Sequence, residues 1–359
     1  MCWKLLVAMA SQKLHLQPRQ SASQLQVSPK LKMSWLNQLP QYWQSTHVVT
    51  WLLWPVEWLY RFVIFIRTQF YKWRIFKTHR VNATVIVVGN VVAGGGGKTP
   101  LTIALVNRLV QQGLQVGVIT RGHGRKRTDL QVVNDQSAVA DVGDEPLLIF
   151  QRCRVPVVVC RNRVQAAQHL LLNFPQIKIL VSDDGLQHLA LGRDIEICVM
   201  DAQGIGNGHL LPAGPLREPW PRTSDFLLHT QTRTLTEGFE SSRQLSPWAL
   251  SKTGQKFSMS DLILTPIELV SGIANPQAFA NMLLELGFQI KCQSALPDHD
   301  DFSKWQASMP DLPLLCTEKD AVKLWQTHPK ALAVPLLFEP EEAFWQQFDS
   351  LLQATPRYH

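Results

Sequence analysis

The sequence predicts an α/β fold: a parallel sheet flanked by helices, with a smaller C-terminal α/β domain and an N-terminal amphipathic helix. Three observations predict it. The β-branched run "ATVIVV" (residues 83–88) leads into four glycines and then into an apolar helical pattern. A second apolar run, "IKILVSDD", ends in two acids, and tryptophan and positive charge concentrate in residues 48–80. Because a single core rarely grows beyond about 250–300 residues, 359 residues predict two packed units.

The excess of positive over negative charge lies at the start of the chain. Residues 1–80 contain eleven Lys and Arg and one acidic residue, which gives this part +10, whereas the whole chain has a net charge of +7. The asymmetry predicts a local anionic partner and no nucleic acid, since it argues against a nucleic-acid groove running over the whole protein. The six cysteines show no CxxC spacing, which favours buried free thiols over disulfides or metal ligands.

Residues 48–80 also contain four of the twelve tryptophans. Pro55, Glu57, Arg61 and Arg67 interrupt the apolar run, so no stretch of about twenty uncharged residues is available to span a bilayer. Indole rings and basic side chains suit the headgroup region of an anionic membrane. We therefore expect a helix lying on a membrane surface; the alternative is an amphipathic helix packed on the protein's own core.

The glycine run has the context of a phosphate-binding loop, because it joins a strand to a helix. Its backbone amides would surround phosphates, Lys98 would reach the β- and γ-phosphates, and Thr99 would place its hydroxyl on Mg²⁺. The pattern G-x-x-x-x-G-K-T is missed only at Val92, where the first glycine belongs. The expected nucleotide-binding residues are Val92, Ala93, Gly94, Gly95, Gly96, Gly97, Lys98 and Thr99.

Further polar clusters follow other predicted strands. Asp183 and Asp184 end "IKILVSDD" and resemble the acidic strand end that helps a P-loop to hold Mg²⁺. Residues 119–126, 142–148 and 199–220 are polar segments near the ends of further predicted strands. Loops at the carboxyl ends of parallel strands build the site in such sheets. We therefore predict a P-loop (RecA-like) nucleotide domain over residues 81–205.

The order of motifs resembles that of the tetraacyldisaccharide 4'-kinases, which phosphorylate the lipid A disaccharide. The shared segments are "GNVVAGGGGKTP", "RGHGR", "VGDEP", "DDGLQH", "GNGHLLPAGPLREP", "LPDH" and "TEKDAVKL", within about residues 33–350. The phosphate loop of this family typically lacks the first glycine, so Val92 fits the resemblance. The resemblance implies transfer of the γ-phosphoryl group of ATP to the 4'-hydroxyl of an acylated disaccharide 1-phosphate lipid, at the cytoplasmic face of the bacterial inner membrane.

The resemblance also implies roles for particular residues. Asp144 is expected to be the base that accepts the hydroxyl proton, with His299 as its partner. Glu145 or Asp183 would assist Thr99 with Mg²⁺, and Arg121 and Arg217 would bind phosphate oxygens. Two departures affect these expectations: His123 stands where the family often has Tyr, and Asp300 stands where it often has a second His.

The remaining boundaries complete the organisation. Residues 1–32 are expected to be a dispensable extension ahead of a true start at Met33, and residues 33–80 a membrane-associated helical segment. Residues 206–359 are expected to form an α/β domain that closes over the site; within it "ALAVPLLFEPEEAFWQQFDSLL" predicts one strand leading into a helix. Two other functions remain open: a P-loop GTPase or metallochaperone-type switch, and a non-catalytic ATP-binding membrane protein. The first would need an Asn-Lys-x-Asp turn, and the comparable turn, residues 317–320, is Thr-Glu-Lys-Asp.

Overall fold

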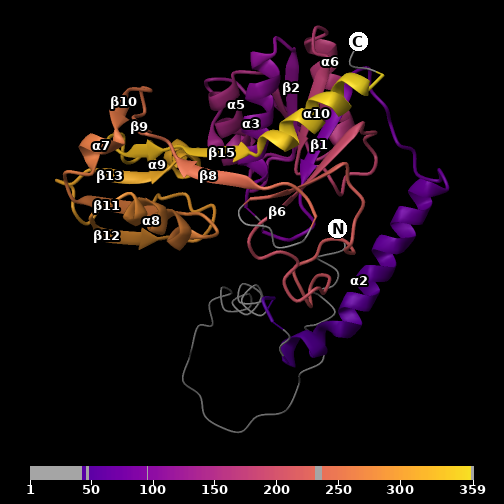
Figure 1. The fold of residues 1–359 in the computed structure, drawn as a ribbon, viewed down its shortest axis with the longest axis horizontal. Coiled ribbons are helices and arrows are strands. Elements are labelled where there is room, and N and C mark those ends of the chain that lie inside the picture. Colours follow the sequence, from indigo (N-terminus) through magenta and orange to yellow (C-terminus); the bar gives the residue numbers. More distant parts are fainter. Residues whose placement is uncertain (1–42, 46–47, 95, 231–236, 357–359) are drawn as a thin grey trace, which may run out of the picture. The chain divides into compact units, whose positions relative to one another are not determined.

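A seven-stranded sheet forms the larger part of the computed structural model (Figure 1), which describes residues 43–45, 48–94, 96–230 and 237–356. Its strand order is β3-β4-β2-β5-β1-β6-β7, and every pair is parallel except β3 with β4. The strands are β1 (Thr84–Gly89), β2 (Val116–Thr120), β3 (Gln131–Val132), β4 (Val157–Val159), β5 (Ile179–Asp183), β6 (Ile195–Met200) and β7 (Phe226–His229). β1 and β5 are buried along their whole length, as central parallel strands require.

A six-stranded sheet with the order β10-β9-β14-β13-β11-β12 forms the smaller part. Its four strands from β14 to β12 are parallel, and β9 and β10 extend the sheet in antiparallel pairing. They are β9 (Trp248–Leu250), β10 (Lys256–Ser258), β11 (Ile267–Ser271), β12 (Ile290–Ala295), β13 (Leu314–Thr317) and β14 (Leu332–Val334). Two antiparallel strands, β8 (Ser241–Leu245) and β15 (Leu336–Pro340), lie between the two sheets in Figure 1.

Helices cover both sheets. They are α2 (Val48–Lys72), α3 (Lys98–Gln111), α4 (Val139–Val142), α5 (Asp144–Cys153), α6 (Arg163–Asn173), α7 (Met259–Leu262), α8 (Pro276–Glu285), α9 (Glu318–Leu324) and α10 (Glu342–Ala354). α3 buries Leu101, Leu105 and Leu109 as its pattern predicts, but Val110 is 40% exposed. Gly113, with φ +81°, follows the end of α3, where only glycine adopts this backbone without strain.

The C-terminal segment returns to the larger sheet. Phe344 and Phe348 of α10 are fully buried in the same core cluster as Ile86 and Val88 of β1. The single strand predicted ahead of the helix in residues 331–352 is wrong: this part forms two strands, β14 and β15, in different sheets. Pro335 lies between them and lacks the amide that would continue a ladder.

The predicted boundary at residue 205 does not separate all parts of the two sheets. Strand β7 follows this boundary but belongs to the larger sheet, and α10, near the end of the predicted C-terminal domain, packs in the core of the larger sheet. The extension over residues 1–32 and the start at Met33 fall outside the described residues. Of the cysteines, Cys153, Cys160, Cys198 and Cys316 are buried free thiols and Cys292 is a half-buried one, as predicted; Cys2 lies outside the described residues.

Candidate functional site

The phosphate loop lies at the carboxyl end of β1 and caps α3. Gly97 is the N-cap residue with φ +109°, a backbone that side-chain-bearing residues rarely adopt. A Cβ atom there would lie 2.4 Å from Cγ2 of Thr230, so only glycine fits. Lys98, the first residue of α3, places Nζ 3.3 Å from Oδ1 of Asn90. The amide of Gly96 donates to Oδ2 of Asp201 at 3.3 Å.

The first residues of the expected cradle pair with another loop. Val92 is 3% exposed and forms an antiparallel bridge with Leu216 of the "PAGPLREP" segment. The amide of Ala93 donates to the carbonyl of Pro215 at 2.7 Å, and it is therefore already satisfied within the protein. Val92 is thus a packing residue, which gives a physical reason for a side chain at the position of the first glycine. Gly95 lies outside the described residues.

The two acids at the end of β5 have different surroundings. Asp183 is 1% exposed and accepts hydrogen bonds from the hydroxyls of Thr102 (3.0 Å) and Thr120 (3.3 Å). Burial, together with the neighbouring carboxylates of Glu145 and Asp184, raises the pKa of Asp183 to about 7. Asp184 is more accessible, and its Oδ1 lies 2.8 Å from Nη1 of Arg217 and 3.8 Å from Nζ of Lys98.

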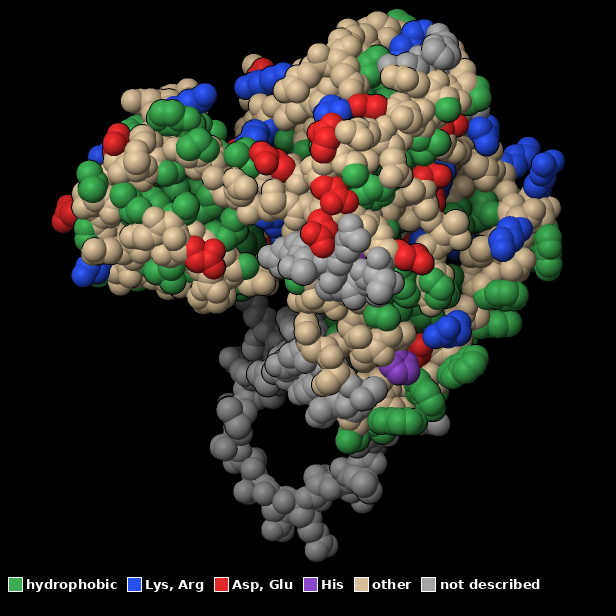
Figure 2. All heavy atoms as spheres, in the orientation of Figure 1, with side chains coloured by type: hydrophobic (Ala, Val, Ile, Leu, Met, Phe, Trp, Pro, Cys, Tyr) green, Lys and Arg blue, Asp and Glu red, His purple; other side chains and the backbone are tan. Residues whose placement is uncertain are grey.

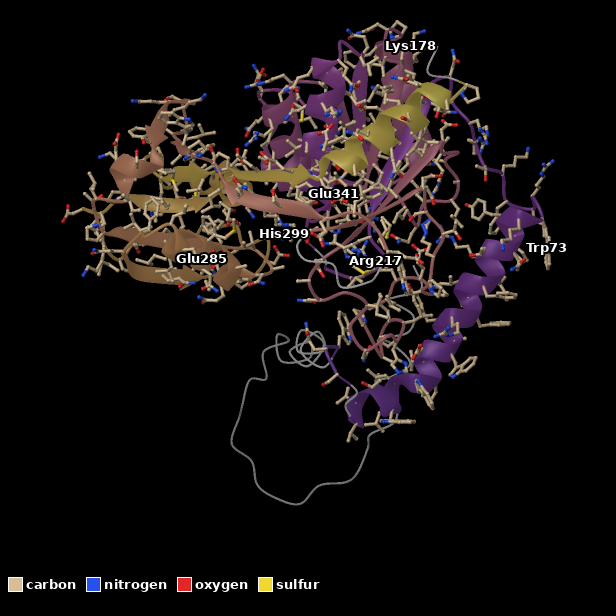
Figure 3. The ribbon with its side chains drawn as sticks, in the orientation of Figure 1. Trp73, Lys178, Arg217, Glu285, His299 and Glu341 are labelled. Atoms are coloured by element: carbon tan, nitrogen blue, oxygen red, sulfur yellow. The ribbon has the colours of Figure 1, made fainter. Side chains whose placement is uncertain are left out.

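The loop after β6 supplies Arg217 to this end of the sheet. The backbone amide of Arg217 donates to the carbonyl of Val91 at 2.6 Å. This hydrogen bond holds the loop after β6 against the segment that leads into the phosphate loop. In Figure 3, Arg217 and His299 lie near each other at one end of the larger sheet, and Lys178 lies at the opposite end of that sheet. Arg121 is exposed in the loop after β2.

Asp144 and His299 come together although 155 residues separate them. Asp144 begins α5 after Gly143, whose φ of +96° makes the sharp entry possible. Nδ1 of His299 lies 2.9 Å from Oδ2 of Asp144. His299 itself has φ +64°, an uncommon backbone for a residue with a side chain and one that clusters at functional sites. Its amide donates to the carbonyl of Gly272 at 3.1 Å, which holds this turn.

Two lysines of α9 complete the cluster, and the sequence reasoning assigned neither of them. Lys323 is buried, with Nζ 3.2 Å from Oδ2 of Asp144. Lys319 places Nζ 3.3 Å from Nε2 of His299 and 3.6 Å from a carboxylate oxygen of Glu145. The signal in the sequence was their spacing of four residues in "TEKDAVKL", which puts both on one face of a helix.

These charges set the protonation of the pair. Burial alone would raise the pKa of Asp144, but the hydrogen bond with His299 and the charges of Lys319 and Lys323 lower it below its ordinary value. The hydrogen bond to Asp144 raises the pKa of His299. Asp144 is therefore an ionised carboxylate at neutral pH.

The donor set fits Mg²⁺ bound together with phosphates. In the described ranges, no three His, Cys, Asp or Glu side chains converge closely enough to hold a metal by themselves. Mg²⁺ in kinases takes one or two carboxylates and fills its remaining positions with phosphate oxygens and water. Asp184 and Glu145, each about a third exposed as side chains, and the hydroxyl of Thr99 have this character.

A parallel sheet with a phosphate loop, an acidic strand end and a carboxylate–imidazole pair defines a P-loop phosphotransferase. Residues 49–353 match the family model for tetraacyldisaccharide-1-P 4'-kinase. The chain is 46% identical over 323 residues to the tetraacyldisaccharide 4'-kinase of Verminephrobacter eiseniae, with coverage of 88% of this chain and 75% of that one. It is 47% identical over 314 residues to that of Acidovorax sp., with coverage of 86% and 93%.

A solved structure agrees with these matches. The crystal structure of LpxK from Aquifex aeolicus in complex with ATP superposes with a TM-score of 0.76 at 26% identity, covering 87% of this chain and all of that one. The chain belongs to the tetraacyldisaccharide-1-phosphate 4'-kinase family. The predicted resemblance, fold class and enzyme class are thereby confirmed. The roles of individual residues stay predictions.

Proposed function

We propose that the protein transfers the γ-phosphoryl group of ATP to the 4'-hydroxyl of a tetraacyldisaccharide 1-phosphate. The observation that carries the proposal is the 2.9 Å hydrogen bond between Asp144, at the start of α5, and His299, in the loop after β12. A P-loop alone would suit many nucleotide-binding proteins. A buried, ionised carboxylate held by an imidazole adds the proton acceptor that an alcohol needs before it can attack phosphorus.

Each group has a stated part in the transfer. Asp144 accepts the proton of the 4'-hydroxyl, while His299 and Lys323 hold its carboxylate in place. Lys98 neutralises charge on the phosphate oxygens as the γ-phosphoryl group leaves ADP. Arg217 offers a planar fork for phosphate oxygens of ATP or of the acceptor, once its bond to Asp184 is exchanged.

Magnesium would be held by Thr99 with Asp184, Asp183 or Glu145. Bound there, it would supply charge neutralisation for the phosphates. Asp184 is favoured over Asp183, because Asp183 is fully buried and already bonded to two hydroxyls.

The direct test uses the full chain with detergent-solubilised tetraacyldisaccharide 1-phosphate and γ-labelled ATP. We expect label on the 4'-position, and much slower transfer from GTP. Binding of ATP without labelled lipid would favour the non-catalytic membrane protein. A preference for GTP would favour the switch protein.

We also propose that α2 carries the protein on the anionic cytoplasmic face of the inner membrane. Among the described residues, α2 is the one helix that is long and apolar enough to cross a membrane, with a mean hydropathy of 1.4 over its most apolar 18 residues. Only 11% of these 18 residues are buried in the protein. Trp51, Leu52, Trp58, Phe62 and Phe65 are all more than half exposed. Figure 2 shows hydrophobic side chains next to Lys and Arg along this edge of the molecule.

Polar contacts on the other side of α2 favour a helix that lies on the membrane. Glu57, 2% exposed, accepts the amide of Leu210 at 3.1 Å. The hydroxyl of Tyr60 donates to the carbonyl of Arg217 at 3.0 Å, and Nη2 of Arg67 donates to that of Gln187 at 2.7 Å. These contacts hold α2 against the loops of the site, which leaves its Trp and Phe face for lipid.

Replacing both Trp58 and Phe62 by serine is expected to weaken binding to phosphatidylglycerol vesicles by about 10–100-fold, because each exposed ring loses about 1.5–3 kcal/mol of apolar burial at most. Vesicle co-sedimentation measures the change. Leu264→Ser is the control, since Leu264 is 81% exposed but lies on the smaller sheet unit. Equal binding of the double variant and the wild type would contradict a membrane role for this face.

A further inference from the structure

Strand β8 carries a half-buried arginine, two of whose donor atoms are buried without a partner in the described protein. Arg243 lies opposite Phe338 of β15, in the middle of the two-stranded ribbon. Its Nε and Nη2 atoms are buried and have no hydrogen-bond partner among the described residues. Burial lowers the pKa of this guanidinium, although Asp201 counteracts the effect. Because an unpaired buried donor costs free energy, such a group in a native protein calls for a ligand.

The unpaired edge of Arg243 lies against the phosphate loop. A Cβ atom on Gly97 would be 2.7 Å from Nη2, and one on Gly96 would be 3.7 Å from the same nitrogen. At Gly97 the guanidinium therefore occupies space that a side chain would need, whereas the 3.7 Å at Gly96 is an ordinary van der Waals contact. Gly97 is also the N-cap of α3, where the helix presents its free amides and positive dipole end.

Two positive features meet beside Gly97: the guanidinium of Arg243 and the N-terminus of α3. The ammonium of Lys98 is paired separately with Asp184, at 3.8 Å. The carboxylate of Asp201 is nearby, but it accepts the amide of Gly96 at 3.3 Å, and no hydrogen bond joins it to Nε or Nη2 of Arg243. Nε and Nη2 form one edge of a planar group, which matches two oxygens of one phosphate.

We propose that Arg243 is a phosphate ligand of the bound nucleotide, supplied by β8 to the phosphate loop beside Gly97. Nε and Nη2 donate to oxygens of the phosphate chain of ATP. This inference rests on the proposed nucleotide site. It adds to that site a residue outside the P-loop and outside every motif that carries the family resemblance.

The arrangement also links the nucleotide to the fold. β8 pairs along its whole length with β15, and the two strands lead into the sheet unit that contains His299. A phosphate bound to Arg243 therefore fastens the ribbon to the phosphate loop. Loss of this contact should weaken ATP binding first, because Arg243 meets neither Asp144 nor His299.

The test compares Arg243→Met and Arg243→Lys in the full chain, with ATP and adenosine as separate ligands. Calorimetry is expected to show ATP bound about 10–100-fold more weakly by Arg243→Met, as for loss of charge-assisted hydrogen bonds, with adenosine affinity unchanged. Arg243→Lys should recover part of the loss. Arg127→Met is the matched control, because Arg127 is a surface residue paired with Asp129.

A second readout separates a ligand role from a structural one. Removing an unsatisfied buried charge should raise the melting temperature of the nucleotide-free protein and reduce the further increase that ATP causes. A nucleotide-free Arg243→Met protein that melts lower than the wild type, or equal losses for ATP and adenosine, would overturn the proposal. If the wild type binds ATP but transfers no phosphate, the proposed function fails while the comparison of affinities still decides the role of Arg243.

Discussion

Replacing Asp144 by asparagine is expected to lower kcat by about 10²–10⁴-fold, the usual contribution of a positioned general base. The substitution keeps the size of the side chain and its place at the start of α5, 2.9 Å from His299. It removes the charge that accepts the proton of the attacking hydroxyl. ATP affinity should not change, because the carboxylate contacts His299 and Lys323 and not the phosphate loop. Single-turnover transfer to the lipid measures the effect, and calorimetry measures ATP binding.

The double variant Asp144→Asn with His299→Ala tests whether the two residues act as a unit. Residues that act together give non-additive losses, so the double variant should be about as slow as Asp144→Asn alone. Fully additive losses would contradict a shared role. Retention of wild-type kcat in Asp144→Asn would remove Asp144 from the mechanism.

The pH behaviour of His299 gives an independent check on the pair. In the wild type the hydrogen bond to Asp144 raises the pKa of His299 above 6.5. The pair therefore adds stability that is fully present below the unfolded-state pKa and is lost as the pH rises through the folded-state pKa. In Asp144→Asn the pKa of His299 should fall. An NMR titration of the imidazole resonances of His299 measures this change. An unchanged titration would contradict the geometry.

Replacing Lys98 by alanine is expected to lower kcat by about 10²–10³-fold, as for loss of one positioned donor to developing charge. Lys98 begins α3 at the phosphate loop, and its ammonium lies 3.3 Å from Asn90 and 3.8 Å from Asp184. The factor by which kcat falls should exceed the factor by which ATP affinity falls, because charge on the phosphate oxygens changes most during the transfer itself.

Lys178→Ala is the matched control for Lys98→Ala. Lys178 is exposed and precedes β5, at the end of the sheet away from the site (Figure 3). It should leave kcat and KM unchanged. Equal activity of Lys98→Ala and Lys178→Ala would contradict a catalytic P-loop.

Local pattern carried the sequence predictions that succeeded. The β-branched run before the glycines became β1, and the acidic run became β5. Such features depend on neighbouring residues, so a sequence contains them directly. The prediction of one strand ahead of the helix in residues 331–352 failed because Pro335 divides an apolar run that, by hydrophobicity alone, resembles a single strand.

Long-range contacts explain what was missed. Arg243 sits in an ordinary strand sequence, and nothing near it indicates that Gly97 lies against its guanidinium. The role of Val92 became clear only with its bridge to Leu216, 124 positions further along the chain. Lys323 is a buried cation only because folding places it on Asp144, 179 residues away.

The sequence by itself determined the family, the phosphate loop and the order of the acidic motifs, since these are properties of short segments. Only the tertiary structure decided which charges meet. It paired Asp144 with His299 and Lys323, and it formed the ion pair between Asp184 and Arg217. It also left Nε and Nη2 of Arg243 without a hydrogen-bond partner beside the phosphate loop. The physical reason is that burial and distance fix electrostatic interactions, and both depend on segments that only the fold brings together.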